Sequence, residues 1–357
     1  MHGDPLMEVT SLMPQDVVLL HDALITLNSQ LSTTLHSTLS TLNLENAGTA
    51  MRFLTAYAAQ LAGCEVVLDG CERMRHRPIG PLVDALRSMG ADITYLGETG
   101  FPPLHIRGKS LAQSQITNHK SRITIQSSLS SQFASALELI GVDCNAPASP
   151  YLTMTRSLIH NYQSAFLNSP SGAHSSILLE KDWSSAAFWY EYVALHGGTI
   201  TLPGLSLDSI QGDKVVAELF DPLGVHTTST PTGITLNSQL STLNSQLSTT
   251  LNSKLYTLNF TSCPDLYPAI AMTCHMLGYQ LQATGIDSLR YKESDRIEMV
   301  KAMLATPNGQ VVKTAHDHRI AMAALAAGRQ VDDEECIAKS YPQFKEQLCK
   351  LSSLAKV

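Results

Sequence analysis

A chain of 357 residues, 44% hydrophobic and 15% charged, is long enough for two buried cores, so we expect a globular protein of two domains. Its formal net charge of −7 and its pI near 6.0 argue against a broad basic surface for nucleic acid or an acidic membrane. The seven cysteines form no Cys-x-x-Cys pair, and their odd number indicates free thiols. With neither a signal peptide nor a membrane span indicated near residue 1, the expected location is the cytoplasm.

A short unit, TLNSQLS, recurs in two regions of the chain, residues 26–44 and 235–259. Its leucines alternate at four- and three-residue spacing, as in the seam of a coiled coil. Asn, Ser and Thr fill most other positions, and these side chains compete with the hydrogen bonds of a helix backbone. We therefore expect both regions to be inserted surface loops, with a short helix or a strand pairing as the alternative.

Outside these regions, one pattern repeats. A short polar segment, called a tip below, precedes an apolar segment that ends at Gly, and a β-like segment follows. In chain order the tips are NAGT (46–49), RHRP (75–78), SLSSQ (128–132), DWSS (182–185), CPDLYP (263–268), KESDR (292–296) and DHR (317–319). Ser, Thr and Asp at such positions cap helix N-termini, and Gly ends helices. The pattern predicts two α/β domains, residues 1–177 and 178–357, separated near NSPSGAHSS.

Basic residues cluster at or near these tips. The candidates are Arg73, Arg75, Arg77, Arg290, Lys292, Arg296, Arg319 and Lys339. Any one cluster is typical of a solvated helix start with surface ion pairs. Helix N-termini attract anions, however, and Arg matches the geometry of carboxylate and phosphate groups. If several tips meet in one cleft, the ligand carries phosphate or carboxylate groups.

Acidic residues accompany the basic ones. Asp265 lies at a predicted helix start, where capping is the simpler explanation of an Asp. Glu293 and Asp295 follow Lys292, where an ion-pair network at a helix start is the simpler explanation. A carboxylate held among several cations stays ionised, so it can also serve as a base.

Other kinds of site find little support in the sequence. HExxH and paired Cys ligands are absent, and His316 and His318 are too close in an extended segment to form a metal site alone. GxGxxG and GxxxxGK[ST] are absent as well, which argues against dinucleotides and P-loop nucleotides. We therefore expect no metal and no nucleotide cofactor.

Taken together, the motifs strongly resemble the 5-enolpyruvylshikimate-3-phosphate synthase family. They occur in the family's order and cover most of the chain outside the two repeat regions. The matching segments are NAGTAMR (46–52), RHRPIGPLVDAL (75–86), SLSSQF (128–133), PDLYPAIAM (264–272), LRYKESDRI (289–297), DHRIAMA (317–323) and KSYPQF (339–344).

The resemblance implies a fold and a reaction. The fold would be the two-domain enolpyruvyl transferase fold, an inside-out α/β barrel built from βαβαββ units that close over a ligand cleft. The reaction would transfer the carboxyvinyl group of phosphoenolpyruvate to the 5-hydroxyl of shikimate 3-phosphate, with release of phosphate, on the pathway to chorismate and the aromatic amino acids. It needs no metal or organic cofactor, and we expect a monomer whose partners are these two anions.

The resemblance also suggests roles for individual residues. The residues that would bind shikimate 3-phosphate are Ser130, Ser131, Gln132, Tyr151, Asp265 and Lys292. The residues that would bind phosphoenolpyruvate are Asn46, Gly48, Thr49, Arg52, Arg77, Gln132, Arg296, Arg319 and Lys339. Asp265 would take the proton of the 5-hydroxyl, and Glu293 with Lys292 would manage the proton at the methylene carbon of phosphoenolpyruvate.

The chain departs from the family at its start. The family's Pro-x-x-Lys-Ser-x-Ser-x-Arg segment, which supplies three substrate-binding residues, has no counterpart before PQDVVLLHDAL (14–24). We expect either that the coding sequence begins further upstream or that the gene is decaying. The alternatives to an active synthase are therefore a truncated remnant that only binds anions and, less favoured by KESDR and NAGTAMR, a transferase that acts on UDP-N-acetylglucosamine.

Overall fold

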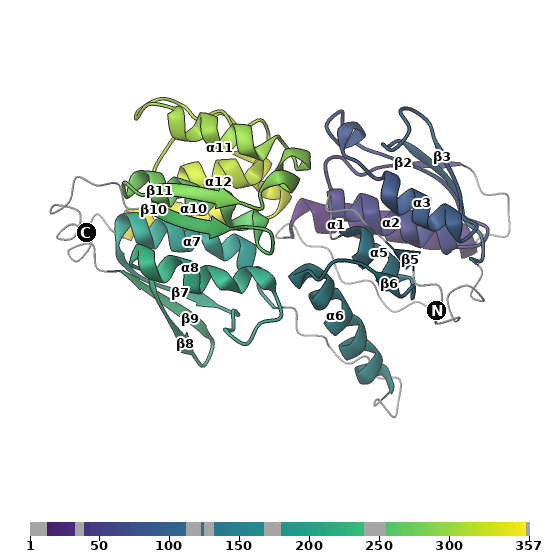
Figure 1. The fold of residues 1–357 in the computed structure, drawn as a ribbon, viewed down its shortest axis with the longest axis horizontal. Coiled ribbons are helices and arrows are strands. Elements are labelled where there is room, and N and C mark those ends of the chain that lie inside the picture. The colour runs from purple at the N-terminus through teal and green to yellow at the C-terminus, as the bar shows by residue number, and fades with distance from the viewer. Residues whose placement is uncertain are drawn as a thin grey trace. The chain divides into compact units, whose positions relative to one another are not determined.

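The computed structural model describes residues 13–32, 39–111, 123–124, 132–167, 180–238 and 255–354 (Figure 1). The chain divides into two compact units. The first comprises Met1–Asn161 with Tyr291–Glu293, and the second comprises Tyr162–Arg290 with Ser294–Val357. The domain boundary expected at residues 177 and 178 lies outside the described residues and stays a prediction. Among the described helices, none combines the length and the apolar composition that a membrane crossing needs.

A four-stranded sheet organises the first unit. Its elements in chain order are β1 (Ser40–Asn43), α2 (Gly48–Gln60), β2 (Glu65–Asp69), α3 (Gly80–Ser88), β3 (Asp92–Tyr95) and β4 (Leu104–Arg107). The strand order is β1-β2-β4-β3; β1 and β2 are parallel, and β4 runs antiparallel to both of its neighbours. This is the predicted βαβαββ unit, and its parallel pair is joined by a helix because parallel strands need a crossover connection.

Helix α2 lies at the centre of the first unit and packs against β2, β4, α1 (Gln15–Ser32), α3 and α5 (Gln132–Leu139). Small residues on α2, among them Ala50, Ala56 and Ala59, are almost fully buried and allow close approach of the neighbouring elements. This unit also contains the short strands β5 (Ile123–Thr124) and β6 (Cys144–Asn145), the single turn η1 (Met74–His76) and the part of helix α6 (Pro150–Leu167) that precedes Tyr162.

Where the structure describes residues 26–44, they form a helix and a strand, the stated alternative, and not the expected loop. The first TLNSQLS copy, residues 26–32, completes helix α1, and residues 40–43 form β1. Leu27 is fully buried in the core of the unit, and Tyr57 on α2 donates a hydrogen bond to the Asn28 side chain at 2.9 Å. Burial against α2 therefore outweighs the weak helix propensity of Asn, Ser and Thr.

The second unit surrounds three buried helices. Helices α7 (Trp183–His196), α10 (Tyr267–Met276) and α12 (His318–Ala326) pack against one another. Helix α7 also packs on the antiparallel sheet β7-β9-β8, and α10 on the parallel pair β10 and β11. The strands are β7 (Gly198–Pro203), β8 (His226–Thr230), β9 (Gly233–Ser238), β10 (Leu255–Asn259) and β11 (Gln280–Thr284). The predicted α/β fold is thus confirmed.

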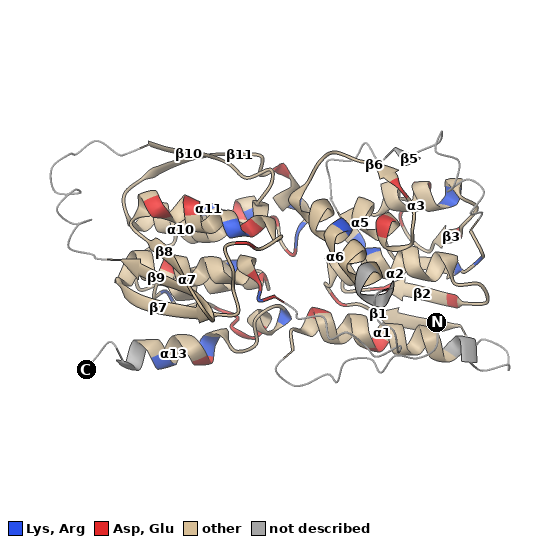
Figure 2. Cartoon of the chain, turned by 90° about the horizontal axis from the view of Figure 1, so that it is seen from below, with Lys and Arg blue, Asp and Glu red and all other residues tan. Residues whose placement is uncertain are grey.

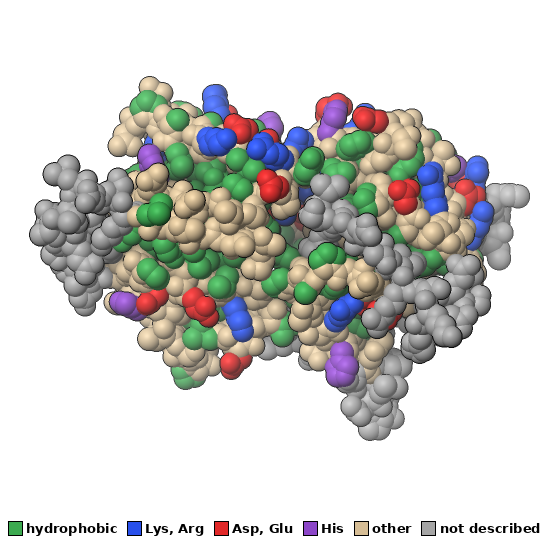
Figure 3. All heavy atoms as spheres, viewed as in Figure 1, with side chains coloured by type: hydrophobic (Ala, Val, Ile, Leu, Met, Phe, Trp, Pro, Cys, Tyr) green, Lys and Arg blue, Asp and Glu red, His purple; other side chains and the backbone are tan. Residues whose placement is uncertain are grey.

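Shorter elements and two outer helices complete the second unit. They are η2 (Gly212–Val215), α8 (Val216–Phe220), η3 (Asp221–Leu223), η4 (Pro264–Leu266), η5 (Asp287–Tyr291), α11 (Arg296–Ala305), η6 (Glu335–Lys339) and α13 (Phe344–Leu354). The core is rich in aromatic side chains, and Trp183, Tyr190 and Phe188 of α7 are completely buried. On the face drawn in Figure 3, Lys and Arg side chains are interspersed with Asp and Glu.

The second repeat region also differs from the expected loop at its two ends. Residues 235–238 belong to β9, where Leu236 is buried, and residues 255–259 form β10. Residues 239–254 lie outside the described residues. Successive residues of a strand face opposite sides of the sheet, so Leu can face the core while a neighbouring Thr faces solvent. The repeat sequence is therefore compatible with a strand here.

Glu191 on α7 is a fully buried acid, and neither of its carboxylate oxygens has a hydrogen-bond partner among the described residues. Burial raises its pKa well above the ordinary value for Glu. An acid that ionises more readily in the unfolded chain lowers the free energy of unfolding as pH rises above its ordinary pKa of about 4.3, until the pH reaches the raised pKa of the folded state.

We therefore expect Glu191→Gln to remove a pH dependence of stability, worth up to about 1.4 kcal/mol for each pH unit in that window. Urea unfolding followed by tryptophan fluorescence at pH 5 and pH 7 measures it. The exposed Glu218 on α8 supplies the matched control, Glu218→Gln, which should keep the parent's pH dependence. An unchanged slope for Glu191→Gln would contradict the expectation.

Candidate active site

Two arginines hold the start of helix α2 in the first unit. Gly48 is the first residue of this helix, which has no acidic residue in its first turn and no side-chain cap. Arg77 donates from Nη1 to the carbonyl oxygen of Asn46 at 3.0 Å and to its side-chain oxygen at 3.1 Å. Arg52, one turn along α2, donates from Nη1 to the carbonyl oxygen of Gly48 at 2.8 Å. The NAGT tip is thus fixed by charged side chains at a helix N-terminus, where anions bind favourably.

Both of these guanidinium groups are buried. Arg52 and Arg77 are each 4% exposed, and the Nε of each has no hydrogen-bond partner among the described residues. Burial, and then the like charge of Arg77, lower the pKa of Arg52 to about 9. The Glu293 carboxylate lies 3.7 Å from Nη1 of Arg77 and compensates part of this charge. Two neighbouring buried cations with one nearby acid favour the binding of an anion.

Arg52 makes more contacts within the protein than the sequence indicated. It also donates from Nη2 to the carbonyl oxygen of Pro78 at 3.3 Å, and its guanidinium carbon lies 5.7 Å from the centre of the Phe133 ring. These contacts join α2 to the segment before α3 and to α5. Arg52 therefore shapes the site as well as adding charge to it.

Gly48 leaves no room for a side chain. A Cβ at this position would lie 2.4 Å from Nη2 of Arg77 and 2.6 Å from Nη1 of Arg52. A larger residue at position 48 would therefore force these guanidinium groups away from the start of α2.

The remaining predicted residues of the first unit are distributed over three segments. Gln132 begins α5 and donates from Nε2 to Oγ1 of Thr49 at 2.7 Å. Tyr151 lies in the first turn of α6. Arg73 donates from Nε to the carbonyl oxygen of Lys292 at 3.0 Å, which holds the short segment that carries Lys292 and Glu293. Ser130 and Ser131 lie outside the described residues.

In the second unit, Asp265 is held between two arginines. It lies in the single turn η4, immediately before α10. One of its oxygens accepts from Nη1 of Arg296 at 2.9 Å, and the other accepts from Nη2 of Arg319 at 3.3 Å. Acidic and basic positions are intermixed in the helices of this unit (Figure 2). The capping role that seemed simpler for Asp265 is replaced by these contacts.

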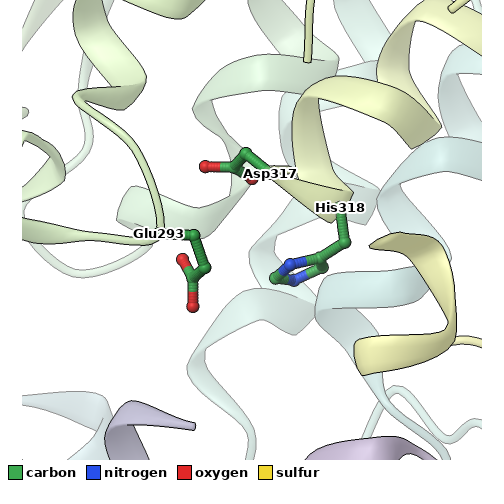
Figure 4. Close-up of side chains that lie close together, drawn as sticks. All are labelled: Glu293, Asp317 and His318. Atoms are coloured by element: carbon green, nitrogen blue, oxygen red, sulfur yellow. The ribbon is translucent and has the colours of Figure 1, made fainter. Parts of the chain in front are cut away.

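Asp317 anchors the two arginines and was not among the predicted site residues. It is fully buried, caps α12 by accepting from the backbone N–H of Arg319 at 3.0 Å, and accepts from Nε of Arg296 at 3.0 Å and from Nη2 at 3.2 Å. Ser294 also donates to it at 2.9 Å. Asp317 and the buried His318 are adjacent at the start of α12 (Figure 4). The position of Asp317 in the DHR tip predicted that it caps a helix. Its ion pair with Arg296 could not be predicted, because the two residues are far apart in the sequence.

The charges in this cluster support one another. Burial is the largest single influence on the pKa of Arg319 and lowers it, as does the like charge of Arg296. The negative charges of Asp265, Asp182 and Asp213 together outweigh both, so the pKa of Arg319 is raised. Lys339 is 9% exposed at the end of η6, which packs against α12, the helix that carries Arg319. The second unit thus combines the acceptor carboxylates of Asp265 and Asp317 with the basic side chains of Arg296, Arg319 and Lys339.

Comparison with known proteins connects this geometry to a family. The family model described as EPSP synthase (3-phosphoshikimate 1-carboxyvinyltransferase) matches residues 21–311 and 305–348. The chain belongs to this family. The 3-phosphoshikimate 1-carboxyvinyltransferase of Bacteroides fragilis (strain YCH46) is 35% identical over 358 residues, which cover 87% of this chain and 83% of that protein. The protein of the same name from Methanoregula boonei is 30% identical to this chain. The alignment covers 87% of this chain and 79% of the Methanoregula boonei protein.

A solved structure shares the fold. An EPSP synthase from Acinetobacter baumannii aligns with a TM-score of 0.56 at 21% identity and covers 87% of this chain and 78% of its own. At this identity the likeness supports the EPSP synthase fold alone.

The residues predicted from the family resemblance form two groups in the structure. The first unit brings together Asn46, Gly48, Thr49, Arg52, Arg77 and Gln132, and its segment 291–293 adds Lys292 and Glu293. The second unit brings together Asp265, Arg296 and Arg319. Asp317 and a further buried acid, Asp213, are the additional residues that the structure reveals.

Proposed function

We propose that this chain is a 3-phosphoshikimate 1-carboxyvinyltransferase. It would transfer the carboxyvinyl group of phosphoenolpyruvate to the 5-hydroxyl of shikimate 3-phosphate and release inorganic phosphate. The observation that carries the proposal is Asp265, a carboxylate held by Arg296 and Arg319 within a chain of the EPSP synthase family. The names of its relatives in Bacteroides fragilis and Methanoregula boonei support the same reaction.

The cations of both units serve to bind anions in this proposal. Those proposed to hold phosphoenolpyruvate are Arg77, Arg296, Arg319 and Lys339, supported by Asn46, Gly48, Thr49, Arg52 and Gln132. Arg forms paired hydrogen bonds with carboxylate and phosphate groups, and a helix N-terminus adds backbone donors. Shikimate 3-phosphate is proposed to bind Ser130, Ser131, Gln132, Tyr151, Asp265 and Lys292.

The proposed chemistry starts at Asp265. Its carboxylate takes the proton of the 5-hydroxyl while the hydroxyl oxygen bonds to C2 of phosphoenolpyruvate, and Glu293 with Lys292 delivers a proton to the methylene carbon. The tetrahedral intermediate then loses phosphate and one proton of the new methyl group, which restores the double bond. Buried cations stabilise the charge that develops on the phosphate as it leaves.

We further propose that the enzyme works as a monomer in the cytoplasm. All seven cysteines are free thiols in the structure, which supports a reducing compartment. Gel filtration at several protein concentrations tests the monomer; a constant dimer volume would contradict it.

A phosphate-release assay with two acceptors tests the proposed reaction. Phosphoenolpyruvate is offered with shikimate 3-phosphate or with UDP-N-acetylglucosamine, and each substrate is also offered alone. Phosphate release that requires both phosphoenolpyruvate and shikimate 3-phosphate is expected. Phosphate release with UDP-N-acetylglucosamine but not with shikimate 3-phosphate contradicts the proposal. Phosphate release from phosphoenolpyruvate without any acceptor contradicts it as well.

Gly48→Ala tests the phosphoenolpyruvate site of the first unit. The added methyl group must displace Arg77 and Arg52, so we expect the KM for phosphoenolpyruvate to rise by about tenfold or more, since losing one charged contact costs about 2 kcal/mol or more. The KM for shikimate 3-phosphate should change less. Gly90→Ala is the control, because a Cβ at Gly90 would meet no atom within 4 Å and its cost is limited to backbone strain. Equal effects of Gly48→Ala on both KM values would contradict this assignment.

A further inference from the structure

Asp213 is a buried acid close to the charged cluster of the second unit. It lies in the turn η2 and is 2% exposed. Ser184, in the first turn of α7, donates its hydroxyl proton to Oδ2 of Asp213. Both η2 and η4, the turn that carries Asp265, pack against α7. The fold therefore brings the two turns that carry Asp213 and Asp265 against one helix.

Several groups set the charge of Asp213. Burial raises its pKa to about 6; the negative charge of Asp265 is the next largest cause and acts in the same direction. The Ser184 hydrogen bond and the positive charge of Arg319 lower the pKa, and Asp182, which caps α7, raises it slightly. The thiol of Cys263, which also feels both carboxylates, has a pKa raised by burial to about 11 and stays neutral. Asp213 therefore changes its charge near pH 6.

The environment of Asp265 explains why a second acid matters. Arg296 and Arg319 both stabilise the ionised form of Asp265, and a carboxylate stabilised in this way is a weaker base. A negative charge beside it acts in the opposite direction, because like charges disfavour ionisation. Asp213 supplies such a charge.

We propose that Asp213 is a positioning residue whose negative charge strengthens Asp265 as a base and steadies Arg319 beside it. The inference rests on the proposed function, in which Asp265 takes the substrate's hydroxyl proton. Asp213 itself receives no proton from the substrate. When Asp213 becomes protonated, its charge is lost, Asp265 becomes a weaker base, and turnover falls. The ionisation of Asp213 thus sets the acid limb of the pH–rate profile.

Two substitutions move this limb in different ways. Asp213→Asn removes the ionisable group, so the limb near pH 6 should disappear and kcat above pH 7 should fall, on the order of tenfold, because proton transfer to a weaker base is slower. The KM values should change little, since Asp213 is not among the residues proposed to bind either substrate. Ser184→Ala removes a hydrogen bond to the ionised form, so the limb should move to higher pH.

The test is kcat against pH from 5 to 9 with shikimate 3-phosphate and phosphoenolpyruvate, for the parent and both variants. The exposed Asp208, in the same loop, supplies the control Asp208→Asn, which should keep the parent's profile. An unchanged limb in Asp213→Asn, or a limb in Ser184→Ala that stays or moves to lower pH, overturns the inference. If Asp213→Asn does not fold, the direction of the Ser184→Ala shift decides. A parent without turnover instead contradicts the proposed function.

Discussion

Replacing Asp265 by Asn is expected to lower kcat of carboxyvinyl transfer by about 10²- to 10⁴-fold, because the substitution removes the proposed general base. Asn keeps the size of the side chain, and its amide oxygen still accepts one of the hydrogen bonds from Arg296 or Arg319. The KM for phosphoenolpyruvate should therefore change far less than kcat. Steady-state phosphate release with both substrates varied separates the two effects.

The control for this prediction is Asp287→Asn, at an exposed acid in the same unit. It should retain the parent's kcat. Circular dichroism at the assay temperature verifies that Asp265→Asn is folded. A folded Asp265→Asn variant with near-normal kcat would show that another group accepts the hydroxyl proton.

Replacing Asp317 by Ala is expected to lower the free energy of unfolding by about 3–5 kcal/mol, since removing one partner of a buried ion pair leaves the other charge uncompensated. Asp317 is completely buried and binds two donor atoms of Arg296, the Ser294 hydroxyl and the first turn of α12. Urea unfolding measures the loss. The two tryptophans of the chain, Trp183 and Trp189, both lie in α7 of the same unit, so their fluorescence reports this unit's unfolding.

Asp295→Ala is the matched control for Asp317→Ala. Asp295 caps α11 by accepting from the backbone N–H of Glu298 at 3.3 Å, but its side chain is 36% exposed and pairs with the half-exposed Arg290. Loss of an exposed cap costs about 1 kcal/mol. Similar losses for the two variants would mean that Asp317 acts only as a helix cap.

Local patterns in the sequence predicted the helix starts of the second unit well. Asp182 caps α7 through the N–H groups of Ser184 and Ser185, and Asp295 and Asp317 cap α11 and α12. Capping depends on residues within one turn of each other, so the sequence contains all of the information. The NAGT tip also lies at the start of its predicted helix, although α2 begins inside the tip at Gly48 and has no side-chain cap.

Partners far apart in the chain could not be predicted in this way. Asp265 pairs with Arg296 and Arg319, and Asp213 with Ser184, because packing of α7, α10 and α12 brings their ends together. Helix propensity likewise failed for residues 26–32, where burial of Leu27 against the core decides the conformation. The family resemblance suggested most of the proposed site residues, but it omitted Asp317 and Asp213, which contact the side chains of Arg296 and Ser184.

The most direct test of the proposed function follows phosphorus by ³¹P NMR in a mixture of the chain, phosphoenolpyruvate and shikimate 3-phosphate. We predict that the phosphoenolpyruvate signal decays while inorganic phosphate appears in equal amount, and that the ester phosphate of shikimate 3-phosphate shifts without being released. Both changes should require both substrates and be lost in Asp265→Asn. Unchanged spectra with the folded parent chain, or phosphate released from shikimate 3-phosphate, would contradict the proposed transferase activity.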